Sequence, residues 1–184
     1  MNSILIGCLA FILFYLFDLN KIRYGIKYIN MLFAAGVILL AVSTASLLLG
    51  NFRSAEIPII WKVLFGALSF CSLILLLSAL FAALPYGDTY VKAGPGTVVD
   101  SGMYALCRHP GVVWFFLFYL FLWLASGRVM VLRAGAVWTT MDLLYAYLED
   151  RWIFPKTLNG YCRYQLEVPF LIPKLTGLKK YFLQ

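Results

Sequence analysis

The sequence is short of charge. Asp, Glu, Lys and Arg together make up 12% of its 184 residues, whereas hydrophobic residues make up 63%. A typical soluble domain is about half apolar and about a quarter charged. A chain this apolar lacks the polar side chains needed to cover its surface in water, so the composition excludes an ordinary soluble domain. It predicts an integral membrane protein instead.

Residues that bind metals and nucleotide phosphates are also scarce. The chain has one histidine, and its four cysteines form no CxxC pair and no other metal-binding spacing. Neither GxGxxG nor GxxxxGKS/T occurs, the glycine-rich patterns typical of dinucleotide and phosphate sites. We therefore expect no zinc site and no phosphate-binding loop.

Acidic residues are fewer than basic ones. Asp and Glu number 8 and Lys and Arg number 15, which gives a net charge of +7. The basic residues lie beside apolar runs rather than in one patch. Anionic lipid headgroups fit this distribution better than nucleic acid does. We therefore expect membrane lipids as partners and no nucleic acid, and the sequence predicts no particular oligomeric state.

Several apolar runs qualify as membrane-spanning helices, which need about 20 mostly apolar residues. They cover residues 3–17, 30–49, 57–84, 111–125 and 129–148, and the first is short. The pattern predicts an all-α, polytopic membrane helix bundle of about five transmembrane helices. We expect a single membrane domain over residues 1–184, with the first three helices in 1–84 and the functional core in 85–184.

The positions of Lys and Arg predict how the helices are oriented. The first connection carries Lys21, Arg23 and Lys27, and the segment after Glu149 carries several more basic residues. The predicted spans place both segments on one side, together with the loop before Pro110. Because basic loops stay in the cytoplasm, we expect an external N-terminus, a cytoplasmic C-terminus and an active site that faces the cytoplasm.

The central loop, residues 85–110, is the longest connection and is rich in Gly and Pro. Gly102 is typical of a backbone turn, and Pro110 is typical of the first turn of a helix. Arg108 and His109 would then lie at the positive end of that helix. This position suits a carboxylate or a carboxylate-bearing cofactor. An equally simple interpretation makes both side chains interfacial anchors that contact lipid headgroups.

Acids stand out around the last predicted helix. Glu149 and Asp150 follow it, at the negative end of its dipole, where acids are unfavourable without a cationic partner. The partner could be a cofactor with a positive centre or, more simply, a nearby Arg or Lys. Alternatively, the two acids are exposed to solvent and need no cationic partner. Asp142 lies within the predicted helix. Because acids inside a membrane usually face the bundle interior or a cavity, Asp142 is a candidate for the substrate side of a site.

The central loop and the C-terminal segment together match one family pattern. It reads V-x-x-G-x-Y-x-x-x-R-H-P before a helix, then a Glu-Glu pair that closes the next helix, then Y-x-x-Y-x-x-x-V-P. Asp150 replaces the second Glu in this chain. The matching residues are Val99, Gly102, Tyr104, Arg108, His109, Pro110, Glu149, Asp150, Tyr161, Tyr164, Val168, Pro169 and Pro173. This pattern resembles the isoprenylcysteine carboxyl methyltransferase group of integral membrane enzymes, to which phospholipid N-methyltransferases and small-thiol S-methyltransferases look related. The resemblance covers roughly the C-terminal half of the chain.

The resemblance implies S-adenosylmethionine as cofactor and methyl donor. It implies that Gly96, Thr97, Val98 and Val99 border the adenosine and that Tyr104, His109 and Glu149 hold the methionine end. By the same resemblance, the cofactor site also includes Gly102, Arg108, Pro110, Tyr161 and Tyr164. The acceptor would be a lipophilic or membrane-partitioned small molecule that reaches the methyl group between helices, from within the bilayer.

Methyl transfer from this donor needs few polar residues. A sulfonium methyl is already activated, so the protein chiefly aligns donor and acceptor and excludes water. A thiol or amine acceptor must also lose a proton, and His109 has a suitable pKa. Tyr145 stands where many family members have an arginine suited to a carboxylate substrate, which weakens the case for a prenylcysteine carboxylate. The candidate catalytic residues are His109, Asp142 and Tyr145.

Two other functions stay open at the level of sequence. Sterol reductases can carry a similar C-terminal pattern, so an NADPH-dependent membrane reductase is one alternative. A non-catalytic membrane scaffold that binds a lipid or a partner is the other. S-adenosylhomocysteine should stabilise the methyltransferase, NADPH should stabilise the reductase, and neither should stabilise the scaffold.

Overall fold

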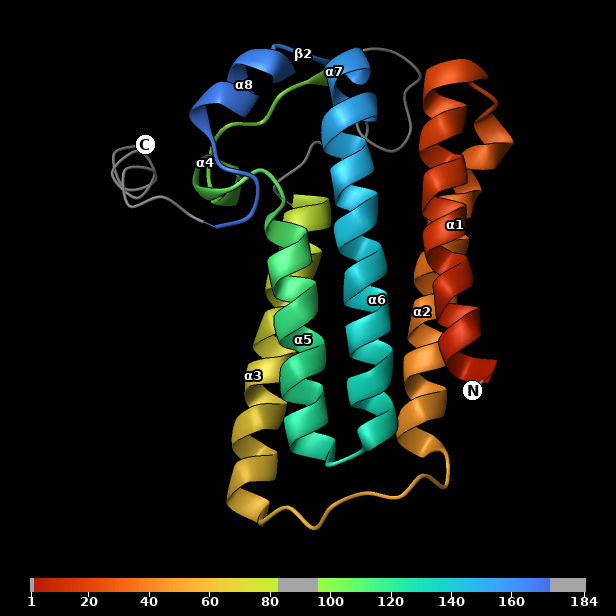
Figure 1. The fold of residues 1–184 in the computed structure, drawn as a ribbon, viewed down its shortest axis with the longest axis vertical. Coiled ribbons are helices and arrows are strands. Elements are labelled where there is room, and N and C mark those ends of the chain that lie inside the picture. Colours follow the sequence, from red (N-terminus) through yellow and green to blue (C-terminus); the bar gives the residue numbers. More distant parts are fainter. Residues whose placement is uncertain (1, 83–95, 173–184) are drawn as a thin grey trace.

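The computed structural model describes residues 2–82 and 96–172, and it shows long helices that run side by side as a bundle (Figure 1). The long helices are α1 (Asn2–Arg23), α2 (Met31–Leu49), α3 (Ile59–Leu77), α5 (Pro110–Ser126) and α6 (Val129–Leu148). The short helical elements are η1 (Lys27–Asn30), η2 (Ser78–Ala82), α4 (Met103–Leu106), η4 (Glu149–Ile153), α7 (Phe154–Thr157) and α8 (Tyr161–Glu167). The predicted all-α architecture is confirmed, with one small addition. Strands β1 (Gly96–Thr97) and β2 (Leu158–Asn159) pair in parallel.

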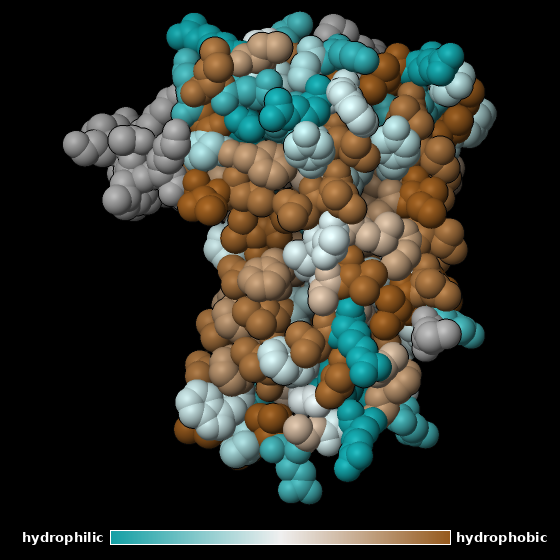
Figure 2. All heavy atoms as spheres, in the orientation of Figure 1, coloured by the Kyte–Doolittle hydropathy of each residue, from teal (hydrophilic) through white to brown (hydrophobic). Residues whose placement is uncertain are grey.

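Within residues 2–82 and 96–172, three helices are long and apolar enough to cross a membrane. The candidate spans are Asn2–Asn20, Tyr28–Leu49 and Ile59–Phe81, and α5 is a shorter apolar helix. Figure 2 shows hydrophobic residues over the middle of the bundle and hydrophilic residues gathered towards its two ends. This distribution is typical of helices that lie in a bilayer.

The bundle consists of two helix pairs joined by α6. Helix α1 packs along α2, α3 packs along α5, and α6 contacts both α1 and α5. Trp138 of α6 is fully buried at this junction, and its indole N–H donates to the carbonyl of Ile4 at 3.0 Å. Glycine is required where the helices approach, because a Cβ at Gly7 would lie 2.2 Å from the Trp138 ring. These contacts fix α6 between the two pairs.

The first helix is longer than the sequence predicts. The apolar run predicts an end near residue 17, but α1 continues to Arg23. The polar residues Asp18 and Asn20 lie beyond the predicted end, yet they are buried within the helix. The Asn20 side chain donates to the carbonyl of Ile26 at 2.9 Å and accepts from its N–H at 3.0 Å. The prediction was wrong because side-chain hydrogen bonds satisfy these polar groups inside the bundle.

The helical path also continues past the predicted end of the last helix. Instead of ending at Leu148, the chain forms the π-helical turn η4 and then α7. Glu149 and Asp150 follow α6, as expected, but they lie in the first turn of η4 and not outside the helical path. Gly160, with φ +82°, then reverses the chain into α8, which lies with β2 at one end of the bundle (Figure 1). Residues 85–95 of the central loop lie outside the described residues, as does Pro173 of the family pattern.

Candidate functional site

A cavity of about 530 Å³ lies inside the bundle. Helices α1, α2, α3, α5 and α6 form its walls, and residues of the central loop, η4, α7 and α8 enclose one end. Its volume falls within the range of small-molecule sites, about 300–1,000 Å³. Most lining side chains are apolar, and the polar ones gather in two places. We call these the polar end, around His109 and Tyr161, and the deep part, around Asp142 and Tyr119.

Most of the site residues predicted from the sequence line this one cavity. They are Thr97, Val98, Val99, Tyr104, Arg108, His109, Asp142, Tyr145, Glu149, Tyr161 and Tyr164. Gly96, Gly102 and Pro110 do not line it but shape the segments that do: Gly96 in β1, Gly102 at φ +57° before α4, and Pro110 in the first turn of α5. The roles of these residues toward a ligand stay predictions.

Backbone hydrogen bonds bring the central loop and the C-terminal segment together. Gly96 pairs with Leu158 in the β1–β2 ladder. The N–H of Arg108 donates to the carbonyl of Pro169 at 2.9 Å, and that of His109 to Phe170 at 3.2 Å. These backbone bonds alone fix the position of the Arg-His-Pro segment at the N-terminal end of α5.

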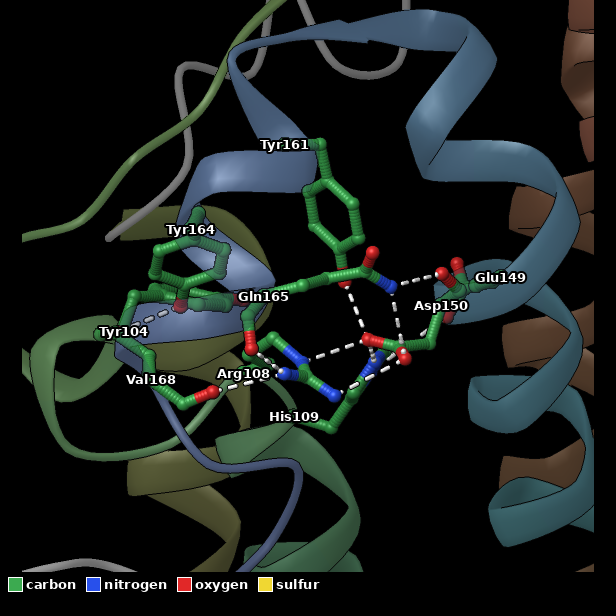
Figure 3. Close-up of polar contacts among 9 residues, drawn as sticks. All are labelled: Tyr104, Arg108, His109, Glu149, Asp150, Tyr161, Tyr164, Gln165 and Val168. Carbon is green, nitrogen blue, oxygen red and sulfur yellow. Dashed lines mark hydrogen bonds and ion pairs between the residues drawn. The ribbon is translucent and has the colours of Figure 1, made fainter.

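Arg108 and Asp150 form the central ion pair of the polar end (Figure 3). The guanidinium donates to both carboxylate oxygens, from Nε at 2.8 Å and from Nη2 at 3.1 Å. Nη1 donates to the carbonyls of Gln165 at 2.7 Å and Val168 at 2.8 Å. The cationic partner expected for the acid pair is therefore Arg108. Because a guanidinium has only five N–H donors, Arg108 positions the C-terminal segment and keeps little capacity for a cofactor carboxylate.

Asp150 is the residue on which this network converges. It also accepts hydrogen bonds from the Tyr161 hydroxyl at 2.7 Å and from Nε2 of Gln165 at 3.1 Å. Burial would raise the pKa of this carboxyl. The contacts with His109 and Tyr161 and the charge of Arg108 outweigh burial and hold the pKa well below its usual range. Asp150 is thus an ionised structural anchor rather than a proton donor.

His109 lies beside this network without taking full part in it. Its Nε2 is 3.4 Å from Oδ1 of Asp150 but forms no hydrogen bond with it. This buried nitrogen therefore has no hydrogen-bond partner among the described residues. Its Nδ1 is 4.0 Å from Oε2 of Glu149. The ring lies against those of Phe154 and Phe170. Burial, the largest effect, lowers the His109 pKa; the nearby Asp150 carboxylate raises it without offsetting burial, and the charge of Arg108 lowers it further. The imidazole is therefore neutral and able to accept a proton.

Tyrosines tie the short helices to the bundle. The Tyr164 hydroxyl donates to the carbonyl of Tyr104 at 2.6 Å, and the Tyr104 hydroxyl donates to the carbonyl of Ala79 at 3.1 Å. Burial raises the pKa of both phenols, so both stay protonated. Burial also raises the pKa of the neighbouring Cys107 thiol to about 11, which makes it a poor nucleophile.

Asp18 and Gln165 are among the residues of the cavity region that escape prediction from the sequence. Asp18 of α1 lines the cavity and accepts a hydrogen bond from the Tyr145 hydroxyl at 2.5 Å. Gln165 donates from Nε2 to the Asp150 backbone carbonyl at 2.6 Å. Asp18 is missed because the apolar run of the first helix ends before it. No sequence signal singles out Gln165, because its contact depends on how α8 folds back over η4.

Comparison with known proteins identifies no relative of this chain. No family model, no curated protein and no solved structure matches the chain. The function is therefore inferred from the cavity, its charge and its polar groups.

Proposed function

We propose that the protein is an integral membrane methyltransferase that uses S-adenosylmethionine to methylate a lipophilic or membrane-partitioned small acceptor. The observation that supports this most is one cavity with a polar end and a long apolar part, lined by residues of the methyltransferase-like pattern. A polar, charged methyl donor and an apolar acceptor need such a divided site. The proposal depends on this site and on the resemblance of the two polar segments.

The charge of the cavity favours this donor. Among the described residues, the charged side chains that line it are Asp18, Asp142, Glu149 and Arg108. Arg108 is already paired with Asp150, so its charge is not available to a phosphate group. A sulfonium and an amino group fit acidic surroundings, whereas the phosphates of NADPH need cationic or N–H donors. The lining therefore favours S-adenosylmethionine over the reductase alternative.

The residues at the polar end fit the shape and chemistry of the donor. The aromatic rings of Phe154, Tyr161 and Tyr164 and the backbone near Val98 would border the adenosine, and Glu149 would bind the amino group. His109 supplies a buried nitrogen without a hydrogen-bond partner in the part of the chain that the structure describes, as a ligand-binding group requires. When bound, S-adenosylmethionine supplies an activated methyl group for direct transfer to a nucleophile.

The protein itself would position the donor and the acceptor and remove a proton from the acceptor. The Arg108–Asp150 pair holds α8 over the polar end and limits access of water. The neutral His109 imidazole accepts a proton from a thiol or amine acceptor if that acceptor lies within hydrogen-bond reach. Helices α2 and α3 both line the cavity, so an acyl or prenyl chain would lie between them.

The membrane arrangement follows from the same proposal. We infer that α1, α2, α3, α5 and α6 all span the bilayer, which places the start of α1 and the polar end on opposite sides (Figure 1). The first connection and the segment from η4 to α8, both of which carry basic residues, lie on the side of the polar end. By the positive-inside rule that side is cytoplasmic, where S-adenosylmethionine is available.

The test is a thermal melt of the detergent-solubilised protein with S-adenosylhomocysteine and, separately, with NADPH. A ligand that binds only the folded state adds about 2.7 kcal/mol at a hundredfold excess over its Kd. We expect S-adenosylhomocysteine to raise the melting temperature in wild type and not in Glu149→Gln. Glu167→Gln, on the exposed face of α8, is the matched control and should respond like wild type. A response to NADPH alone would support the reductase, and no response from a folded protein would support a scaffold.

A further inference from the structure

The deep part of the cavity contains a carboxylate without a protein partner among the described residues. Asp142 lies on α6, on the same helix face as Glu149 and seven residues before it, which is about 10 Å along the helix. It lines the cavity and makes no hydrogen bond or ion pair in the part of the chain that the structure describes. Most of the surrounding lining is apolar, including Leu76, Phe115 and Phe118. A carboxylate in such surroundings is unfavourable unless something binds it.

The neighbouring hydroxyl groups have already used their hydrogens. Thr44 donates to the carbonyl of Leu40 at 2.8 Å, and Thr44 and Tyr119 share a hydrogen bond of 2.7 Å. A hydroxyl has one hydrogen to donate, so Tyr119 is the donor in this pair while Thr44 donates to Leu40. Tyr119 lies close enough to Asp142 for the two side chains to interact electrostatically. The remaining capacity of Thr44, Tyr119 and Asp142 is therefore for accepting hydrogen bonds.

A site that offers only acceptors and a negative charge selects a ligand that offers donors and a positive charge. We propose that Asp142, with Tyr119 and Thr44, binds the protonated nitrogen of an amphiphilic amine whose apolar chain occupies the rest of the cavity. Taking this amine to be the methyl acceptor rests on the proposed function and requires that its nitrogen first pass a proton to a base such as His109, whereas the binding itself does not. Against ionised Asp142, a carboxylate-bearing amphiphile would meet three acceptors, so the site disfavours it.

Binding of tritiated dodecylamine to the full chain in phosphatidylcholine nanodiscs tests this directly. Empty nanodiscs correct for partition into lipid, and unlabelled dodecylamine, dodecanol and dodecanoate compete for the site. We expect saturable binding that dodecylamine displaces and dodecanol and dodecanoate do not. Asp142→Asn, which keeps the shape of the side chain, should weaken binding at least tenfold, and Tyr119→Phe should weaken it less. Melting curves of each variant establish that it is folded.

Three results would overturn the proposal: no saturable binding by folded wild type, equal binding by Asp142→Asn, or equal displacement by dodecanol. The last would show that donor groups without charge suffice. S-adenosylhomocysteine binding, measured on the same samples, separates the two proposals. In folded wild type, absence of amine binding alone would refute the amine site, and absence of S-adenosylhomocysteine binding alone would refute the methyltransferase.

Discussion

The two parts of the cavity differ in how their polar groups are satisfied. At the polar end, Arg108, Asp150 and Tyr161 bond to one another and to backbone carbonyls. In the deep part, Asp142 faces the cavity with no hydrogen bond or ion pair among the described residues. Buried polar groups are nearly always hydrogen-bonded in folded proteins. The satisfied network therefore indicates structural support, and the unsatisfied carboxylate indicates ligand recognition.

Removal of the Asp150 charge should have the largest effect on the polar end. Asp150→Asn leaves the Arg108 guanidinium without a counter-charge, and we expect a loss of about 3–5 kcal/mol in the free energy of unfolding. The two side chains are 12% and 4% exposed, so solvent screens the pair weakly. Unfolding in mixed SDS micelles, followed by Trp fluorescence, measures the loss.

The matched control for this variant is Glu167→Gln. It removes the partner of Arg163 in an exposed pair on α8, where the Arg163 side chain is 88% exposed. We expect a change below about 0.5 kcal/mol. Similar losses in the two variants would contradict the view that the Arg108–Asp150 pair holds the site together.

Tyr161→Phe should have an intermediate effect. The variant removes the hydroxyl that donates to Asp150 at 2.7 Å and keeps the ring against Phe154. Hydrogen bonds to charged groups contribute about 1.5–3 kcal/mol, and we expect a loss of this size in the same unfolding assay. Tyr147→Phe is the control, since that side chain is 49% exposed. An unchanged Tyr161→Phe protein would show that Asp150 does not depend on this bond.

His109 should make the stability of the polar end depend on pH. Burial lowers its folded pKa below the ordinary value of about 6.5, so the unfolded chain binds the proton first as the pH falls. The contribution of the neutral imidazole is complete above about pH 6.5 and is lost towards the folded pKa, by at most about 1.4 kcal/mol per pH unit. The contribution of Asp150 is lost only below about pH 3.9.

Unfolding of wild type and His109→Gln between pH 7 and pH 5 measures this effect. We expect wild type to lose stability relative to the variant as the pH falls. Parallel pH curves would show that His109 does not remain buried and neutral.

The smallest stability change is expected for the deep part of the cavity. Asp142→Asn removes a charge that has no partner within residues 2–82 and 96–172, so the free energy of unfolding should stay the same or rise. The same chemical change at Asp150 should strongly destabilise the protein. A clear loss of stability in Asp142→Asn would mean that the carboxylate has a structural role, and the distinction between the two parts would then disappear.

The apolar runs predict most of the fold, because helix length and hydrophobicity are local properties. The predicted bounds of α2, α5 and α6 agree with the structure to within a residue or two. The prediction fails at Asp18, where α1 continues past the predicted end, and it misses the π-helical turn η4 that follows α6. The β1–β2 pair depends on backbone hydrogen bonds between segments far apart in the sequence, which no local pattern predicts.

The candidate site was predictable as a set of residues but not as a set of contacts. The pattern around Arg108 and Glu149 indicated that two segments share a site, and the structure brings them together. It did not show that Arg108 binds Asp150 in preference to a ligand, because the geometry of a guanidinium depends on the folded α8. The acceptor-only surroundings of Asp142 likewise emerge only when the bonds of Thr44 and Tyr119 are known.

The most direct measurement is a titration of purified wild type, Glu149→Gln and Asp142→Asn with S-adenosylhomocysteine. If the polar end binds the methyl donor and the deep part binds the acceptor, Glu149→Gln weakens S-adenosylhomocysteine binding at least tenfold and Asp142→Asn leaves it unchanged. No saturable binding by folded wild type, or an equal loss in both variants, would contradict this division of the cavity.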